Sequence, residues 1–202
     1  MIYWTSVYED EVTHQVMLKI YDFFKGHFSE LRGIPCSGKG KIMKHIRAYN
    51  NAAKHGYYFV ITDLDDDYDC APLLIKDWLP DIHANQLLFR VAVHEVESWL
   101  LADKKNLAAF FSISQELVPS KPDNEADPKR TVITLAKRSR KREIRESIVP
   151  IDDYATIGPG YNIIFRNFIQ NFWNIDSARR NSHSLDRAIR SLEKIIRPDI
   201  DI

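Results

Sequence analysis

Residues 57–69 read YYFVITDLDDDYD, and this stretch decides the fold. The run from Tyr57 to Thr62 is apolar without polar alternation, which is typical of a parallel strand buried on both faces. It opens directly into an acidic segment that begins at Asp63. Apolar runs of the same kind lie at residues 2–7 and 87–93, and helical patterns separate the three. This alternation predicts an α/β fold, a mainly parallel sheet flanked by helices.

The second half of the sequence has helical patterns and no further strand. We expect residues 1–103 to form the α/β core and residues 104–202 to form a helical extension packed on it. Within the core, residues 29–40 are expected to be irregular and residues 41–55 helical. In the extension, helices are expected at residues 129–146, from Tyr161, and from Leu185, the last two with apolar faces that belong to the core.

Composition excludes several classes of protein. Of the 202 residues, 28 are Lys or Arg and 28 are Asp or Glu, so a uniformly basic surface for nucleic acid is excluded. No run approaches the ~20 apolar residues of a membrane helix, so no membrane association is expected. The N-terminus has no basic segment or cleavage site of a signal peptide. We therefore expect a cytoplasmic protein whose two cysteines, Cys36 and Cys70, are reduced.

Carboxylates follow each of the three predicted strands. They are Glu9 after the first, Asp63 and Asp65 after the second, and Glu95 and Glu97 after the third. The carboxyl ends of parallel strands meet at one edge of a sheet, which is the usual ligand crevice. Clustered carboxylates favour a divalent cation, and hard oxygen ligands suit Mg²⁺ or Mn²⁺. The alternative is a solvated, Asp-rich turn that binds no metal.

A glutamate after one strand and Asp-x-Asp after a later strand resemble the Toprim domain of topoisomerases, primases and OLD-family nucleases. The whole chain is similar to a family of uncharacterised bacterial Toprim-like proteins. The similarity rests on five segments, residues 60–65, 90–103, 127–129, 158–162 and 184–188.

This resemblance implies a Toprim, Rossmann-like fold and roles for the acidic residues. Glu9 would be the general acid/base or a metal ligand, and Asp63 and Asp65 would be metal ligands. Glu95 and Glu97 match the family's own acidic helix start and would complete the metal shell. Many Toprim domains have Gly after the glutamate, where this chain has Asp10. Proteins of this kind are suspected to work beside an ATPase in phage defence.

A second motif lies at residues 33–40, GIPCSGKG. It fits G-x-x-x-x-G-K, the start of a phosphate-binding loop, but Gly40 replaces the Ser or Thr that would hold Mg²⁺. No clear apolar strand precedes it. We expect a flexible loop in which Lys39 faces a phosphate backbone or solvent, and a nucleotide-binding enzyme stays open as an alternative.

Cations are concentrated in one segment of this neutral chain. Lys and Arg side chains neutralise nucleic-acid phosphates without reading the sequence of bases. The candidate nucleic-acid-binding residues in this segment are Lys129, Arg130, Lys137, Arg138, Arg140, Lys141 and Arg142. The alternative is a solvated helix face.

Together these patterns predict a protein that hydrolyses nucleic-acid phosphodiester bonds with Mg²⁺ or Mn²⁺, with Glu9, Asp63 and Asp65 as catalytic residues. A catalytically silent partner or regulator of an ATPase is the alternative in a different class.

Overall fold

The computed structural model describes residues 1–80 and 82–197. The chain divides into two compact units. The sheet unit contains Met1–Val93 and the C-terminal segment from Ser184, and the helical unit contains His94–His183. This division differs from the predicted one in two ways. The first boundary falls after Val93 and not after residue 103, and the C-terminal helix joins the first unit.

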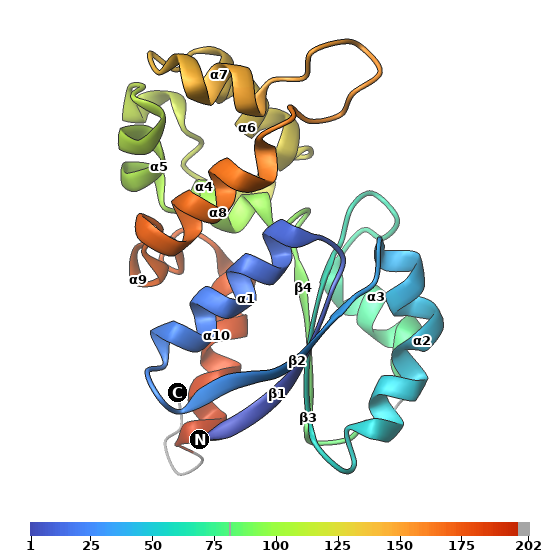
Figure 1. The fold of residues 1–202 in the computed structure, drawn as a ribbon. Helices are drawn as coiled ribbons and strands as arrows, with labels where there is room; N and C mark the ends of the chain where they lie inside the picture. The colour runs from blue at the N-terminus through green and yellow to red at the C-terminus, as the bar shows by residue number, and fades with distance from the viewer. Residues whose placement is uncertain (81, 198–202) are drawn as a thin grey trace. The chain divides into compact units, whose positions relative to one another are not determined.

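The sheet unit is built on four parallel strands in the order β2-β1-β3-β4. The strands are β1 (Ile2–Tyr8), β2 (Phe28–Pro35), β3 (Tyr57–Asp63) and β4 (Leu87–Ala92). Its helices are α1 (Glu11–Phe23), α2 (Lys39–Ala52), α3 (Ala71–Trp78) and α10 (His183–Ile196). Figure 1 shows α1 and α10 on one face of the sheet and α2 and α3 on the other. The predicted α/β fold with a parallel sheet and C-terminal helices is confirmed.

The central strand β3 is buried on both faces, as its continuous apolar run predicts. On one face, Val60 belongs to a cluster with Ile42 of α2 and Leu74 of α3. On the other face, the Phe59 ring meets the rings of Trp4 and Tyr21, with centroids 6.0 and 6.1 Å apart. Burying such side chains contributes about 1.5–3 kcal/mol each. The strand is therefore fixed, and with it the position of Asp63 at its end.

The strand β2 corrects the expectation that residues 29–40 are irregular. It pairs in parallel with β1 from Phe28 to Pro35, with a register shift between Trp4 and Thr5 of β1. Among the described residues it lies at the edge of the sheet, where one side of the strand has no neighbouring strand. An edge strand needs less apolar surface than a central one. This explains why the polar sequence FSELRGIP forms a strand without the apolar pattern that predicts one.

The helical unit consists of short helices around an aromatic core. In this core, the rings of Tyr161 and Phe165 lie 4.7 Å apart, and the Trp173 indole donates to the carbonyl of Trp99. The helices are α4 (Glu97–Ala102), α5 (Lys104–Phe111), η1 (Gln115–Leu117), η2 (Pro122–Asn124), α6 (Pro128–Lys137), α7 (Arg142–Ile148), α8 (Tyr161–Asn171) and α9 (Ile175–Ala178). Over the described part of the chain, no helix combines the length and apolar character needed to cross a bilayer.

The helix expected over residues 129–146 is in fact two helices, α6 and α7, joined by a turn at residues 138–141. Ser139 holds this turn, because its buried hydroxyl donates to the carbonyl of Phe111 at 2.5 Å and accepts from the backbone N–H of Lys141 at 3.1 Å. Arg145 donates to the Ser139 carbonyl. A serine that bonds backbone groups outside its own helix competes with the helical ladder, so the helix ends there.

Candidate functional site

Glu9 and Asp63 meet at the carboxyl ends of β1 and β3. Glu9 Oε1 accepts one hydrogen bond from Thr62 Oγ1 at 2.5 Å and another from the backbone N–H of Asp63 at 2.9 Å. The two strands are parallel neighbours, so their ends lie at the same edge of the sheet. The structure thus places the Glu9 carboxylate against the backbone of Asp63. The convergence of the acidic side chains around a cation stays a prediction.

The environment of Glu9 disfavours negative charge. Burial raises the pKa of Glu9, and the charges of Asp65 and Asp10 add to that rise, while the hydrogen bonds from Thr62 and Asp63 oppose it. The Asp63 residue is only 6% exposed. A carboxylate that is withdrawn from water in this way, as that of Glu9 is, gains from a nearby cation.

Asp10, the residue that follows Glu9, has a structural role here. It is the N-cap of α1, and its side chain accepts from the backbone N–H of Thr13 at 2.8 Å. An N-cap of this kind stabilises a helix by about 1 kcal/mol. Asp10 thus fixes the start of α1 directly beside Glu9.

Lys39 lies against the acidic segment. Its ammonium is 2.7 Å from Asp65 Oδ2, 2.5 Å from Asp67 Oδ2 and 3.2 Å from the carbonyl of Leu64. Burial alone would lower the pKa of Lys39, but the hydrogen bonds to the two aspartates outweigh it and raise the pKa. The Lys39 side chain is 17% exposed. In this structure Lys39 therefore faces aspartates of the chain itself and is mostly withdrawn from solvent, and its contact with a phosphate backbone stays a prediction.

The phosphate-loop motif is also rearranged. Gly33 lies inside β2, and α2 begins at Lys39, so only residues 36–38 form a loop. Ser37 and Gly38 have positive φ values of 47° and 104°. A strand and a helix do flank the loop, but its lysine points to aspartates of the chain itself.

A second charged cluster lies within the helical unit. Glu95 accepts from both the backbone N–H and the ammonium of Lys129, at 2.8 and 3.1 Å. Glu97 is fully buried and accepts from the Tyr161 hydroxyl at 2.8 Å, with the Lys129 ammonium 3.8 Å away. Lys129 is thus bound to glutamates at the start of α6, although the sequence suggested that it contacts nucleic acid.

Tyr161 is a member of this cluster that the sequence analysis did not find. Its spacing with the phenylalanines of α8 assigns it to the core, and it is indeed buried. The available signal was chemical: a buried tyrosine hydroxyl usually has a hydrogen-bond partner.

The five predicted acidic residues belong to two units. Glu9, Asp63 and Asp65 lie in the sheet unit, and Glu95 and Glu97 lie in the helical unit. In residues 1–80 and 82–197 there is no group of three or more His, Cys, Asp or Glu residues that could hold a metal ion. Within the described residues, neither unit therefore brings three such side chains together at one place.

The remaining predicted cations are on the surface of α6, α7 and the turn between them. Lys141 lies over the Phe110 ring, 5.3 Å from its centroid, and Arg142 pairs with Glu146 at 2.6 Å. We call the exposed cations of this segment the basic patch. Its members are Arg130, Lys137, Arg138, Arg140, Lys141 and Arg142.

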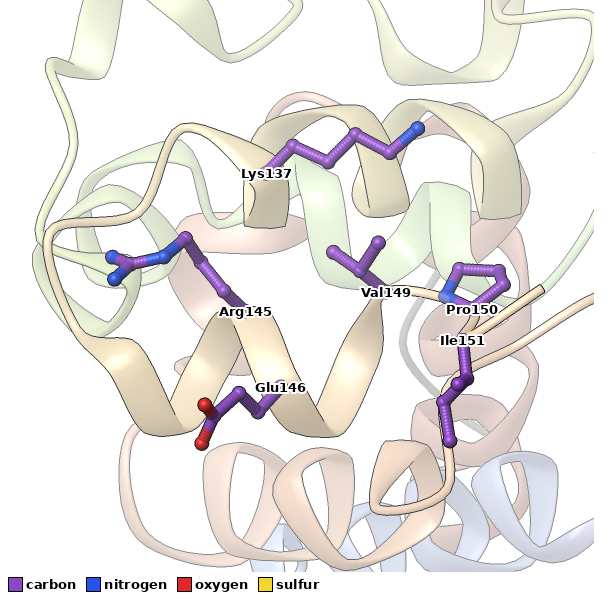
Figure 2. Close-up of a pocket in the computed structure, with 6 residues that line it drawn as sticks. All are labelled: Lys137, Arg145, Glu146, Val149, Pro150 and Ile151. Carbon is purple, nitrogen blue, oxygen red and sulfur yellow. The ribbon is translucent and has the colours of Figure 1, made fainter.

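A groove adjoins the basic patch (Figure 2). It has a volume of about 480 Å³. Its lining combines the charged residues Lys137, Arg145 and Glu146 with the apolar residues Val149, Pro150 and Ile151. Lys137 is shared between the patch and the groove.

Comparisons of the chain with family models, curated proteins and solved structures give no match.

Proposed function

We propose that the protein hydrolyses phosphodiester bonds of nucleic acid with the help of Mg²⁺ or Mn²⁺. The observation that carries this proposal is the meeting of Glu9 and Asp63 at the carboxyl ends of adjacent parallel strands. That edge of a parallel sheet is where ligands of open α/β folds bind. The resemblance of residues 60–65 to the Asp-x-Asp of Toprim domains supports the same assignment.

The donors present fit such an ion in kind. They are hard carboxylate oxygens, and Mg²⁺ is usually bound by one or two carboxylates together with waters and substrate phosphates. A larger cluster of protein ligands is therefore unnecessary. Asp63 and Asp65 would hold the ion, with Glu9 as the base or as a second ligand. When bound, the ion would stabilise charge on the phosphate oxygens and activate water.

Glu95 and Glu97 are not part of this proposed set. Each accepts hydrogen bonds within the helical unit, from Lys129 and from Tyr161 respectively. A carboxylate that already binds a partner inside the protein would lose that contact on binding a metal. The partner would then be left without its counterpart. We assign this cluster to holding α4, α6 and α8 together.

The basic patch supplies the second part of the function, which is binding to the nucleic-acid backbone. Its side chains are exposed and come from one segment, in a chain whose total charge is zero. Such a patch positions a strand through its phosphates and gives salt-dependent affinity.

The test is a nuclease assay on single- and double-stranded DNA and RNA with Mg²⁺ or Mn²⁺. We expect Asp63→Asn to lose cleavage and Asp66→Asn, in the exposed part of the same segment, to retain it. Circular dichroism of both variants would show that they are folded. Equal cleavage by wild type and Asp63→Asn would exclude the proposed site.

A second candidate function is that of a silent binding or regulatory partner of an ATPase. The ion pairs of Lys39 with Asp65 and Asp67 favour it, because they already neutralise part of the acidic segment. Electron paramagnetic resonance of Mn²⁺ separates the two candidates. Mn²⁺ binding that Asp63→Asn removes supports the enzyme, and a chain that does not bind Mn²⁺ supports the silent partner.

A further inference from the structure

The groove beside α7 has an apolar floor and a charged side. The charged side carries Lys137, Arg145 and Glu146, and the Glu146 carboxylate pairs with Arg142. Figure 2 shows Lys137 extended along one side, with Val149, Pro150 and Ile151 following one another across from it. Ile151 is 79% exposed, although burial of an apolar side chain of that size is favourable. A ligand that suits this groove has a flat or compact apolar part joined to a negative charge.

The end of α7, which immediately precedes the floor of the groove, is held in place by the chain that follows it. The backbone N–H of Gly158 donates to the carbonyl of Ile148 at 2.9 Å, and that of Gly160 donates to Ser147 at 2.9 Å. A Cβ on Gly158 would lie 2.4 Å from the Ser147 carbonyl oxygen, so only glycine permits this approach. The end of α7 is therefore held before any ligand binds, which lowers the entropic cost of binding.

On the charged side Arg145 is also anchored, and this side is continuous with the basic patch. Arg145, which lines the groove, donates to the carbonyl of Ser139 in the turn that carries Arg138 and Arg140. Residues 129–151 contain eight Lys or Arg and two Glu, a difference of six positive charges. A chain of phosphates is complementary to this surface.

We propose that the groove binds one unstacked base of a single-stranded nucleic acid whose phosphates lie on the basic patch. This inference rests on the proposed function and names its substrate class. In a duplex the faces of the bases are covered by stacking, whereas a single strand can place a base on an apolar surface. Only a single strand can therefore use the groove and the patch together.

The test is fluorescence anisotropy in EDTA, with a thymidine oligonucleotide, the same oligonucleotide with abasic sugars, and a duplex of equal length. The abasic probe keeps every phosphate and lacks every base. We expect wild type to bind the thymidine probe roughly fivefold more tightly than the abasic probe, since covering part of one base with aliphatic side chains contributes about 1 kcal/mol. The combined change of Val149→Ser and Ile151→Ser should remove this preference and leave abasic binding unchanged.

Charge variants separate the phosphate contacts from the base contact. Lys137→Gln should weaken binding of both single-stranded probes and reduce the dependence on salt by about 0.7 in logarithmic slope. Lys54→Gln, an exposed site in the sheet unit, is the control and should bind as wild type does. Thermal melts of the helical unit's variants, made in the full chain, would show intact folding.

Several outcomes would overturn the inference. These are equal wild-type affinity for the thymidine and abasic probes, equal affinity for the duplex, or a base preference that survives the double substitution. Binding of a polyglutamate probe as tight as that of the thymidine probe would identify an acidic peptide as the occupant instead. Because the assay contains no divalent ion, its outcome is independent of whether Asp63 supports cleavage.

Discussion

Lys39 and Asp65 form an ion pair of 2.7 Å that joins the start of α2 to the β3–α3 loop. The pair places a cation of the protein itself beside the carboxylates of the proposed metal site. A divalent ion and the Lys39 ammonium would compete for the oxygens of Asp65.

This competition predicts that Lys39→Met binds Mn²⁺ more tightly than wild type does. A unit charge at about 4 Å contributes ~1 kcal/mol even in water, which corresponds to roughly a fivefold change in affinity. Electron paramagnetic resonance titration of free Mn²⁺ measures the difference. The control is Lys41→Met, an exposed lysine two residues further along α2. Weaker binding in Lys39→Met would mean that Lys39 supports the site and does not compete with the ion.

The raised pKa of Glu9 leads us to expect that the stability of the protein depends on pH. Burial raises its pKa above the ordinary value of 4.5, so the folded state binds the proton more tightly than the unfolded state. The stability that protonated Glu9 contributes is complete below the unfolded pKa and is lost as the pH rises through the folded pKa. Glu9→Gln mimics the protonated form and should be more stable than wild type at neutral pH.

Urea unfolding at neutral pH and at a pH below the unfolded pKa measures this effect. The advantage of Glu9→Gln should disappear at the lower pH, where the wild-type side chain is also neutral. Asp66→Asn, on an exposed side chain of the same unit, serves as the comparison. A Glu9→Gln protein less stable than wild type at neutral pH would contradict the prediction.

The hydrogen bond from Tyr161 to Glu97 should contribute to the stability of the helical unit. Tyr161→Phe removes the hydroxyl that donates to fully buried Glu97 and should lower the free energy of unfolding by about 1–3 kcal/mol. Chemical denaturation of the full chain gives this value. Tyr154→Phe is a matched control. Because Tyr154 is 98% exposed, this variant should unfold as wild type does. Indistinguishable curves for the two variants would show that Glu97 does not depend on this hydrogen bond.

A side chain at position 158, behind the groove, should destabilise the protein by steric overlap. Gly158→Ala places a Cβ 2.4 Å from the Ser147 carbonyl oxygen and should destabilise the protein by roughly 1–3 kcal/mol or more. Gly56→Ala adds a methyl group with no atom within 4 Å and should have little effect. Differential scanning calorimetry of both variants compares them directly. Equal melting temperatures would show that the end of α7 moves at little cost.

The elements that the sequence predicted correctly are those whose burial determines their composition. Tyr57–Asp63 is apolar because it is the central strand, and a run of that kind is visible without any structure. Strand β2 is missed because an edge position tolerates polar side chains such as Glu30 and Arg32. The break between α6 and α7 is missed because it depends on a bond from Ser139 to Phe111, 28 residues earlier.

The same distinction applies to the candidate site. The proximity of Glu9 and Asp63 follows from strand order, because parallel neighbours end at one edge. The partner of Lys39 does not follow from strand order. It depends on loop backbones that turn through positive φ at Ser37, Gly38 and Asp65, and local sequence does not specify which side chains those turns bring together. Ion pairs between loops therefore require the folded chain.

The helix α10 has a consequence for how the chain is made. Its side chains Leu185, Ile189 and Leu192 are fully buried, and Arg90 of β4 donates to Ser191 on it. On the ribosome, all four strands emerge first, and the entire helical unit is translated before this helix appears. The nascent sheet must wait with one apolar face incompletely covered, so that interval of synthesis is when chaperones or premature association have access to it.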